Sequence, residues 1–155
     1  LTSIGLNFRG FVQHLKVYLG LYALMVPVIL IAAERPDFQG TYPFIAEAKA
    51  SVPNFLIWEA FYVLQFFSLE AFFRGYVIFT LEKVMPRALS IAIMVIPYTM
   101  IHFHKPFLET MGAVLAGTFL GWLALRYRSW AGGAVIHALV GMTMDFLSVH
   151  RAGLF

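Results

Sequence analysis

Long apolar runs alternate with short polar connections along this chain, and five apolar segments can be distinguished. They span residues 11–33, 54–81, 88–104, 107–125 and 130–149. Their apolar residues do not alternate with polar ones at the period of two that strands require, so the pattern predicts helices. The segment 54–81 is longer than an untilted membrane span, and we expect it either to tilt strongly or to break near Ser68.

The composition places these helices in a membrane. Hydrophobic residues make up 61% of the chain and charged residues only 12%, and the mean hydropathy is +0.79. Soluble domains are nearer to half apolar and a quarter charged. We therefore predict an all-α fold, a polytopic transmembrane helical bundle of about five to six membrane helices. It forms a single domain over 1–155 with a motif-bearing core at about 54–149, and the absence of strand alternation disfavours an outer-membrane barrel.

The few charges limit the classes of partner. The net charge of +3 is spread thinly at the segment ends, which suits loops beside anionic headgroups and offers no patch for nucleic acid. With the amino end in the cytoplasm, six Lys and Arg face in and four face out, which favours that orientation. We expect an integral protein of a prokaryotic inner membrane, in contact with the lipid bilayer and with a membrane-associated peptide or protein substrate.

The stretch 66–79, FFSLEAFFRGYVIF, places two full charges inside an apolar segment. Glu70 and Arg74 are one helical turn apart, a spacing at which side chains meet. Either ion alone would be costly in lipid, so we expect Glu70 to face the bundle interior. Two interpretations stay open: a buried salt bridge that fixes the fold, or a general base, Glu70, whose position and pKa are set by Arg74.

Other ionisable groups lie near the ends of later segments. His102 lies about one turn from the end of its segment, and Glu109 falls in the first turn after Pro106, where a carboxylate favours the positive helix end. We expect Glu109 to cap that helix. The last segment carries a stripe of residues at intervals of four. These are Gly133, His137, Gly141 and Asp145. A His on such a stripe is either an interhelical packing residue or part of a site, and the glycines leave room for a backbone to approach.

Three motifs occur together in one order: ExxxRG at 70–75, YxxxH at 98–102 and GGAVIHALV at 132–140. With their membrane context they resemble the CAAX prenyl protease and bacteriocin-processing family of intramembrane proteases, also called the CPBP or Abi family. The likeness covers roughly residues 65–147. It implies a peptidase in which a Glu and two His gather in a cavity open to one membrane face, activate water and stabilise the oxyanion at the scissile carbonyl.

The residues of the family's three motifs can be assigned one by one to positions in this sequence. Glu70 and Arg74 fall on the first motif, whose family form is a Glu pair, three residues and Arg. Tyr98 and His102 fall on the second motif, and His137 falls on the third. The expected catalytic residues are Glu70, Arg74, His102 and His137. Substrate-binding or supporting roles are expected for Tyr98, Glu109, Gly141 and Asp145.

Two positions depart from the family pattern. Leu69 replaces the first Glu of the pair, and Gly141 replaces a polar residue of the third motif. Either Glu70 serves as the base and Asp145 supplies the missing polar group, or activity has been lost. We favour a working enzyme that hydrolyses a peptide bond with water activated by Glu70.

The same residues leave the question of a metal open. His102, His137 and a carboxylate form a zinc ligand set with an open fourth position, while the absence of Cys excludes thiolate ligands. A metal-free glutamate mechanism uses the same groups and is equally consistent with the sequence.

Two other classes of function compete with the peptidase. One is a non-catalytic relative that binds a membrane peptide or a partner helix, as Leu69 and Gly141 suggest. The other is a small transporter or ion-relay subunit that uses the intramembrane charges, although no internal repeat supports it.

Overall fold

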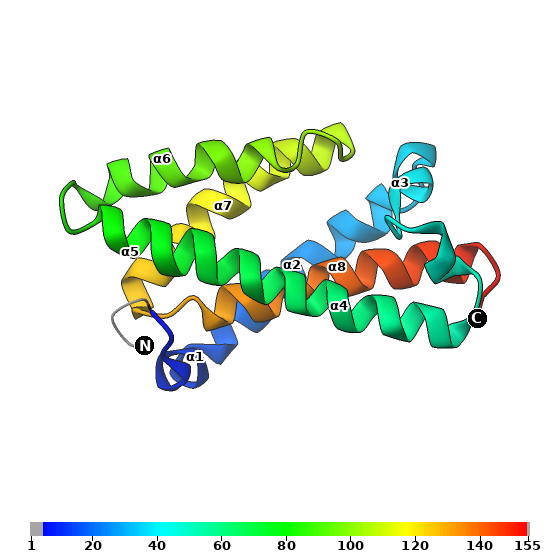
Figure 1. Ribbon diagram of the computed structural model, residues 1–155, viewed down its shortest axis with the longest axis horizontal. Helices are drawn as coiled ribbons and strands as arrows, with labels where there is room; N and C mark the ends of the chain where they lie inside the picture. The colour runs from blue at the N-terminus through cyan, green and yellow to red at the C-terminus, as the bar shows by residue number, and fades with distance from the viewer. Residues whose placement is uncertain (1–4, 155) are drawn as a thin grey trace.

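The computed structural model describes residues 5–154, and every regular element in that range is helical (Figure 1). The elements are α1 (Phe8–Gln13), α2 (Leu15–Ala32), α3 (Pro36–Thr41), the 3₁₀ helix η2 (Ala46–Lys49), α4 (Val52–Glu70), the π-helix η3 (Ala71–Val77), α5 (Ile78–Leu81), α6 (Arg87–Met100), α7 (Phe107–Tyr127) and α8 (Ala131–Arg151). The prediction of an all-α membrane bundle is confirmed.

Four helical runs of the described chain are long and apolar enough to cross a membrane. They are Leu15–Ala32, Val52–Leu81, Phe107–Tyr127 and Ala131–Arg151. The remaining predicted segment forms α6, which is apolar but has 14 residues. It is shorter than expected because the chain leaves the helix at Ile101 and turns before Pro106, whose ring disfavours a helical residue ahead of it.

The segment from Val52 to Leu81 forms one continuous helical run rather than two helices broken at Ser68. Its start is capped by Ser51, whose Oγ accepts a hydrogen bond from the backbone N–H of Asn54 at 3.3 Å. The run changes from α to π geometry directly after Glu70, in the stretch that contains Arg74. Single π-helical stretches inside α-helices are frequent at functional sites.

Glycines bring the helices close together. A Cβ at Gly117 of α7 would lie 2.8 Å from the ring of Tyr98 on α6, so this glycine lets α6 and α7 pack closely. On α8, a Cβ at Gly132 would lie 2.2 Å from the ring of Tyr18 on α2. Helix α8 therefore lies between α2 and α4, while α6 and α7 form the other side of the bundle (Figure 1).

The outer surface of the bundle is apolar. Large side chains on the outward faces of α2, α4 and α7 are exposed, among them Leu24, Ile31, Phe61 and Leu115. In water such a surface would be unfavourable, whereas in a bilayer it faces hydrocarbon. The surface and the four long helices together indicate an integral membrane protein.

Candidate active site

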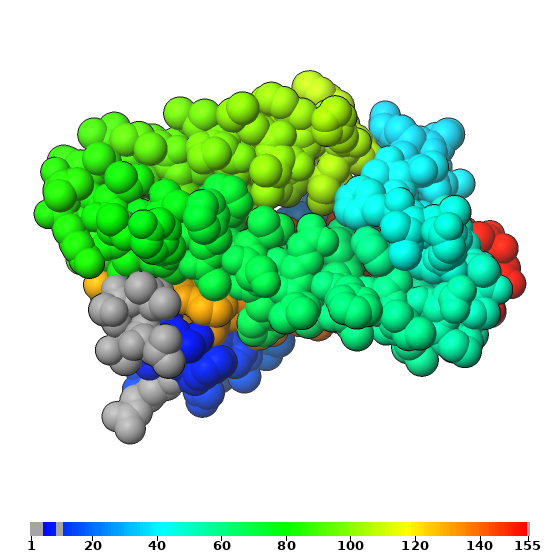
Figure 2. Space-filling model, in the orientation of Figure 1, coloured from blue at the N-terminus to red at the C-terminus, as the bar shows by residue number. Residues whose placement is uncertain are grey.

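A cavity of about 250 Å³ opens between α4, the turn that follows α6, and α8. Figure 2 shows the surface hollowed between α4 and the segment after α6. The lining residues are Tyr62, Gln65, Phe66, Leu69, Ile101, His102, Lys105 and His137. Two of the predicted catalytic residues, His102 and His137, therefore lie on the wall of the same pocket although they come from distant segments.

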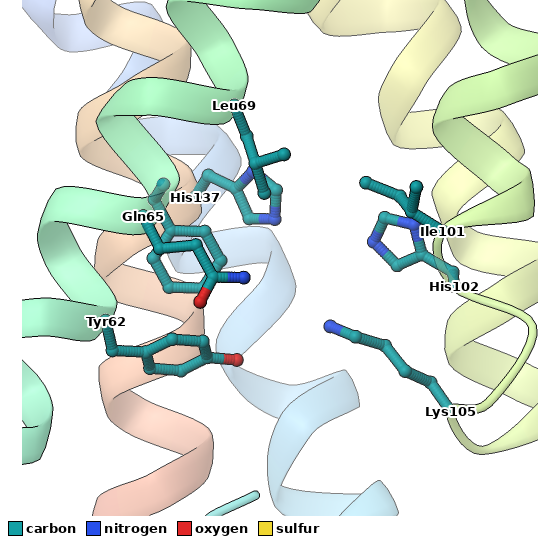
Figure 3. Close-up of a pocket in the computed structure, with 8 residues that line it drawn as sticks. Tyr62, Gln65, Leu69, Ile101, His102, Lys105 and His137 are labelled. Atoms are coloured by element: carbon teal, nitrogen blue, oxygen red, sulfur yellow. The ribbon is translucent and has the colours of Figure 1, made fainter.

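The two histidines face the pocket from opposite sides (Figure 3). Their ring centroids are 6.5 Å apart, so the rings do not touch and the cavity lies between them. Nδ1 of His102 lies 2.8 Å from the backbone carbonyl oxygen of Tyr98. A carbonyl can only accept, so Nδ1 of the neutral ring carries the proton and Nε2 is left with a free lone pair.

His137 is held by a carboxylate. Its Nδ1 lies 3.0 Å from Oε1 of Glu70, and the same oxygen accepts a hydrogen bond from Nη1 of Arg74 at 2.6 Å. Because the ion pair with Arg74 favours an ionised Glu70, the carboxylate is the acceptor and Nδ1–H of His137 is the donor. Nε2 of His137 is consequently available to the pocket, as it is in His102.

Glu70 itself does not line the pocket. Its side chain is fully buried, as is that of Arg74, whereas Leu69 faces the cavity beside His137 (Figure 3). Residue 69 reaches the cavity with its side chain, whereas the side chain of residue 70 is directed at Arg74 and His137. The structure therefore places an apolar side chain at the pocket and the carboxylate behind His137.

Tyr98 and Arg74 complete the layer beneath the pocket. The guanidinium carbon of Arg74 lies 3.8 Å from the centroid of the Tyr98 ring, a cation–π contact in a buried setting. The ring of Tyr98 also contacts His102, at a centroid distance of 4.9 Å. Tyr98 thus positions His102 through its ring and its carbonyl oxygen, and it fixes Arg74 from the other side.

The two predicted glycines have packing roles on α8. A Cβ at Gly133 would lie 2.9 Å from Oε2 of Glu70, so this glycine gives the carboxylate its space. A Cβ at Gly141 would lie 2.5 Å from the ring of Phe66 on α4. The space that we expected to receive a substrate backbone is therefore occupied by this chain's own side chains.

Asp145 lies away from the pocket, in the interface between α4 and α8. It is fully buried, and its Oδ2 accepts a hydrogen bond of 2.5 Å from Nε1–H of Trp58. Glu59 is buried next to it. Asp145 does not take the place of the polar residue that Gly141 lacks, because it is not among the residues that line the cavity.

Glu109 lies in the first turn of α7, but it does not cap the helix as expected, because its carboxylate is engaged by the side chains of Lys105 and Tyr42. It pairs with Lys105 at 2.8 Å and accepts a hydrogen bond from the hydroxyl of Tyr42. Burial raises the pKa of the Tyr42 hydroxyl, and the charge of Glu109 raises it further. Glu109 thereby orients Lys105, which lines the pocket.

Three polar lining residues were not predicted from the sequence: Tyr62, Gln65 and Lys105. The helical period gave a signal for two of them, because Tyr62, Gln65 and Leu69 recur at intervals of three and four on one face of α4. Helical periodicity gives no signal for Lys105, because this residue lies in the turn after α6. All three side chains can donate hydrogen bonds, and Figure 3 shows them directed into the cavity.

The donors at the pocket do not make a full metal site. Zinc sites in proteins usually take at least three protein ligands. In the range 5–154 no three His, Cys, Asp or Glu side chains are grouped to hold a metal ion. Glu70, the carboxylate that contacts His137, is already bound by Arg74 and His137, and Glu109 is paired with Lys105 and Tyr42. These residues do not fit zinc.

The sequence of this region identifies the family. Residues 51–143, more than half of the chain, match the family model described as type II CAAX prenyl endopeptidase Rce1-like. The chain belongs to the Rce1-like family. No curated protein and no solved structure matches it.

The family match covers the site of this Rce1-like chain. It contains the buried pair and both pocket histidines, and it ends two residues before Asp145. Helices α1 and α2, which lie outside the match, contact α8. Membership of this family makes the chain a relative of intramembrane CAAX-type proteases.

Proposed function

We propose that this Rce1-like chain is an intramembrane endopeptidase that hydrolyses a peptide bond of a membrane-associated substrate. The observation that carries the proposal is the pair His102 and His137. Each presents Nε2 to one cavity and is held through Nδ1 by a buried acceptor. Two histidines that served only to pack helices together would not need a shared cavity between them.

His137 is the proposed general base. Its Nε2 takes a proton from a water molecule as the water attacks the scissile carbonyl carbon, and the imidazolium then gives that proton to the leaving amine. Glu70 stabilises the imidazolium through Nδ1, as a carboxylate does behind a catalytic histidine. We therefore place Glu70 as a positioning residue that acts through His137, rather than as a group that touches the water.

His102 holds the attacking water, and Gln65 stabilises the oxyanion. With Nδ1–H donated to the Tyr98 carbonyl, Nε2 of His102 accepts the second hydrogen of the attacking water and holds it in the cavity. The amide of Gln65 donates to the oxyanion that develops on the substrate carbonyl. A preorganised donor in a cavity shielded from water is worth more than the same donor in bulk solvent.

Lys105 and Tyr62 indicate the substrate class. A cationic ammonium and a hydroxyl at the same apolar pocket favour a carboxylate, and the family name specifies CAAX prenyl substrates. A cavity of about 250 Å³ is at the lower end of ligand pockets, so it holds only a short peptide segment. We propose a lipid-modified peptide cut close to its free carboxyl end.

The test is peptide cleavage by protein reconstituted in liposomes. The substrate is a synthetic peptide with a farnesylated Cys near a free carboxyl terminus, and products are separated by mass. We expect cleavage by the wild type and by the control His104→Ala, whose side chain is exposed in the turn outside the pocket. His137→Ala should be at least about 100-fold slower. Equal rates for the two variants would overturn the proposal.

A second candidate function is peptide binding without cleavage. Leu69 favours it, because this apolar residue faces the pocket where the family motif has a carboxylate. The same liposome assay separates the two functions if Leu69→Glu is added. A wild type that binds the peptide without cutting it, together with a gain of cleavage in Leu69→Glu, would establish a non-catalytic relative.

A further inference from the structure

A second concave site lies between α6 and α7, at the end of the bundle away from His102. It is a depression of about 50 Å³ lined by Arg87, Ile91, Trp122, Leu125 and Arg126. None of these residues contributes to the proposed active site, which is built from α4, α8 and the turn after α6.

The depression has a cationic rim and an apolar floor. Each helix contributes an arginine at its end and an apolar side chain one turn further into the helix: Arg87 with Ile91 on α6, and Trp122 with Arg126 on α7. Trp122 is 48% exposed, whereas Ile91 and Leu125 are buried. Tryptophan is enriched at the membrane–water interface, so the two arginines lie at the level of the lipid phosphates.

The positive charge of the rim is only partly neutralised by the described residues. The segments 82–87 and 126–130 contain four basic residues and one acid, Glu82. That acid is shared by Arg87, at 3.6 Å, and Arg128. Arg126 is exposed and makes no ion pair or hydrogen bond with the described residues. The first turn of α6 carries no acidic residue, so its positive end adds to the field.

We infer that this depression binds the headgroup of an anionic phospholipid, with the phosphodiester between Arg87 and Arg126 and the acyl chains along Trp122 and Ile91. Guanidinium groups match a phosphate with paired donors. The apolar floor fits the glycerol and upper acyl region of the same molecule, which a free phosphate ion lacks. Basic pockets between membrane helices bind lipid headgroups by this combination of charge and apolar contact.

The experiment is native mass spectrometry of the detergent-solubilised protein, titrated with phosphatidylglycerol and with phosphatidylcholine of the same acyl chains. We expect tighter binding of phosphatidylglycerol. Each of Arg87→Gln and Arg126→Gln should weaken it about fivefold, the effect of one basic residue near the surface. Lys83→Gln removes the same charge from the same end but outside the depression, and it should change the affinity less than twofold. Both arginines are exposed, so these variants keep the fold.

Three outcomes would overturn the assignment. Equal losses in all three variants would mean diffuse attraction to the basic end. Displacement of the lipid by millimolar inorganic phosphate would mean a plain anion site. Dimers in the wild type that disappear in Arg126→Gln, with no lipid preference, would mean that a second copy of the chain covers this surface. None of these outcomes depends on peptidase activity, so they leave the proposed function unaffected.

Discussion

The carboxylate of Glu70 lies 3.0 Å from Nδ1 of His137, although 67 residues separate them in the chain. The charged pair in the apolar stretch 66–79 thus has a partner beyond its own helical turn. A local salt bridge between Glu70 and Arg74 requires no such contact. The arrangement links the buried pair on the α4–α5 run to a histidine that faces a cavity.

If Glu70 orients His137, the substitution Glu70→Gln should act on the rate rather than on substrate binding. A neutral amide stabilises the imidazolium poorly and permits the wrong ring tautomer, so we expect kcat to fall at least about 100-fold with KM nearly unchanged. Cleavage kinetics on the folded fraction of the variant provide the measurement. A variant with wild-type kcat would show that the contact has no part in catalysis.

Removing one charge of the Glu70–Arg74 pair should destabilise the protein more than removing both. Glu70→Leu leaves the fully buried Arg74 without a counter-ion and should lower the free energy of unfolding by about 3–5 kcal/mol. The double variant Glu70→Leu with Arg74→Met removes both charges and should recover most of that loss. Unfolding in detergent micelles measures both, and a double variant no more stable than the single one would contradict this account.

The glycines of α8 and α7 allow a matched comparison. A Cβ at Gly141 would lie 2.5 Å from the Phe66 ring, whereas a Cβ at Gly112 would meet nothing within 4 Å. We expect Gly141→Ala to destabilise the protein by about 1–3 kcal/mol through overpacking. Gly112→Ala should be neutral or stabilising by up to about 1 kcal/mol, because alanine favours the helix. Thermal unfolding in one detergent compares them, and equal shifts would refute the tight packing at Gly141.

Apolar periodicity predicted the helices and the membrane class, because lipid-facing and interior residues both leave long runs in the sequence. It could not predict the short α6, which ends where the turn before Pro106 begins. Motif spacing singled out His102 and His137, which line one pocket, and it predicted that Glu70 would contact the water, whereas Glu70 lies behind His137. Tertiary packing decides which face of α4 meets the pocket, and it also decides which partner each imidazole takes. Lys105 lies in a turn without any period, and its position depends on Glu109 and the loop around Tyr42.

Lys105 should select substrates by their terminal charge. The wild type should prefer a peptide with a free carboxylate over its carboxyl-terminal amide by about fivefold or more, the value of a charge-assisted contact. Lys105→Met should lose this preference, and Lys105→Arg should retain part of it. The ratio of kcat/KM for the two peptides is the measurement. A ratio that is the same in Lys105→Met as in the wild type would exclude this role.

The donor set at the pocket favours a reaction without zinc. Among the described residues, His102 and His137 alone present imidazole nitrogens to the cavity, so we expect purified active protein to contain well below one zinc per chain. A chelator should leave peptide cleavage unchanged. Elemental analysis that finds about one zinc per chain, lost in the variant His102→Ala with His137→Ala, would instead establish a metal site.

The most direct test of the peptidase assignment is cleavage of the farnesylated peptide in water enriched in ¹⁸O, followed by mass analysis of the fragments. Hydrolysis at the pocket predicts one ¹⁸O atom in the new carboxyl group of the amino-terminal fragment. This product should form with the wild type and with His104→Ala but not with His137→Ala. An intact peptide after incubation with folded wild-type protein, or the same labelled product from His137→Ala, would contradict the assignment.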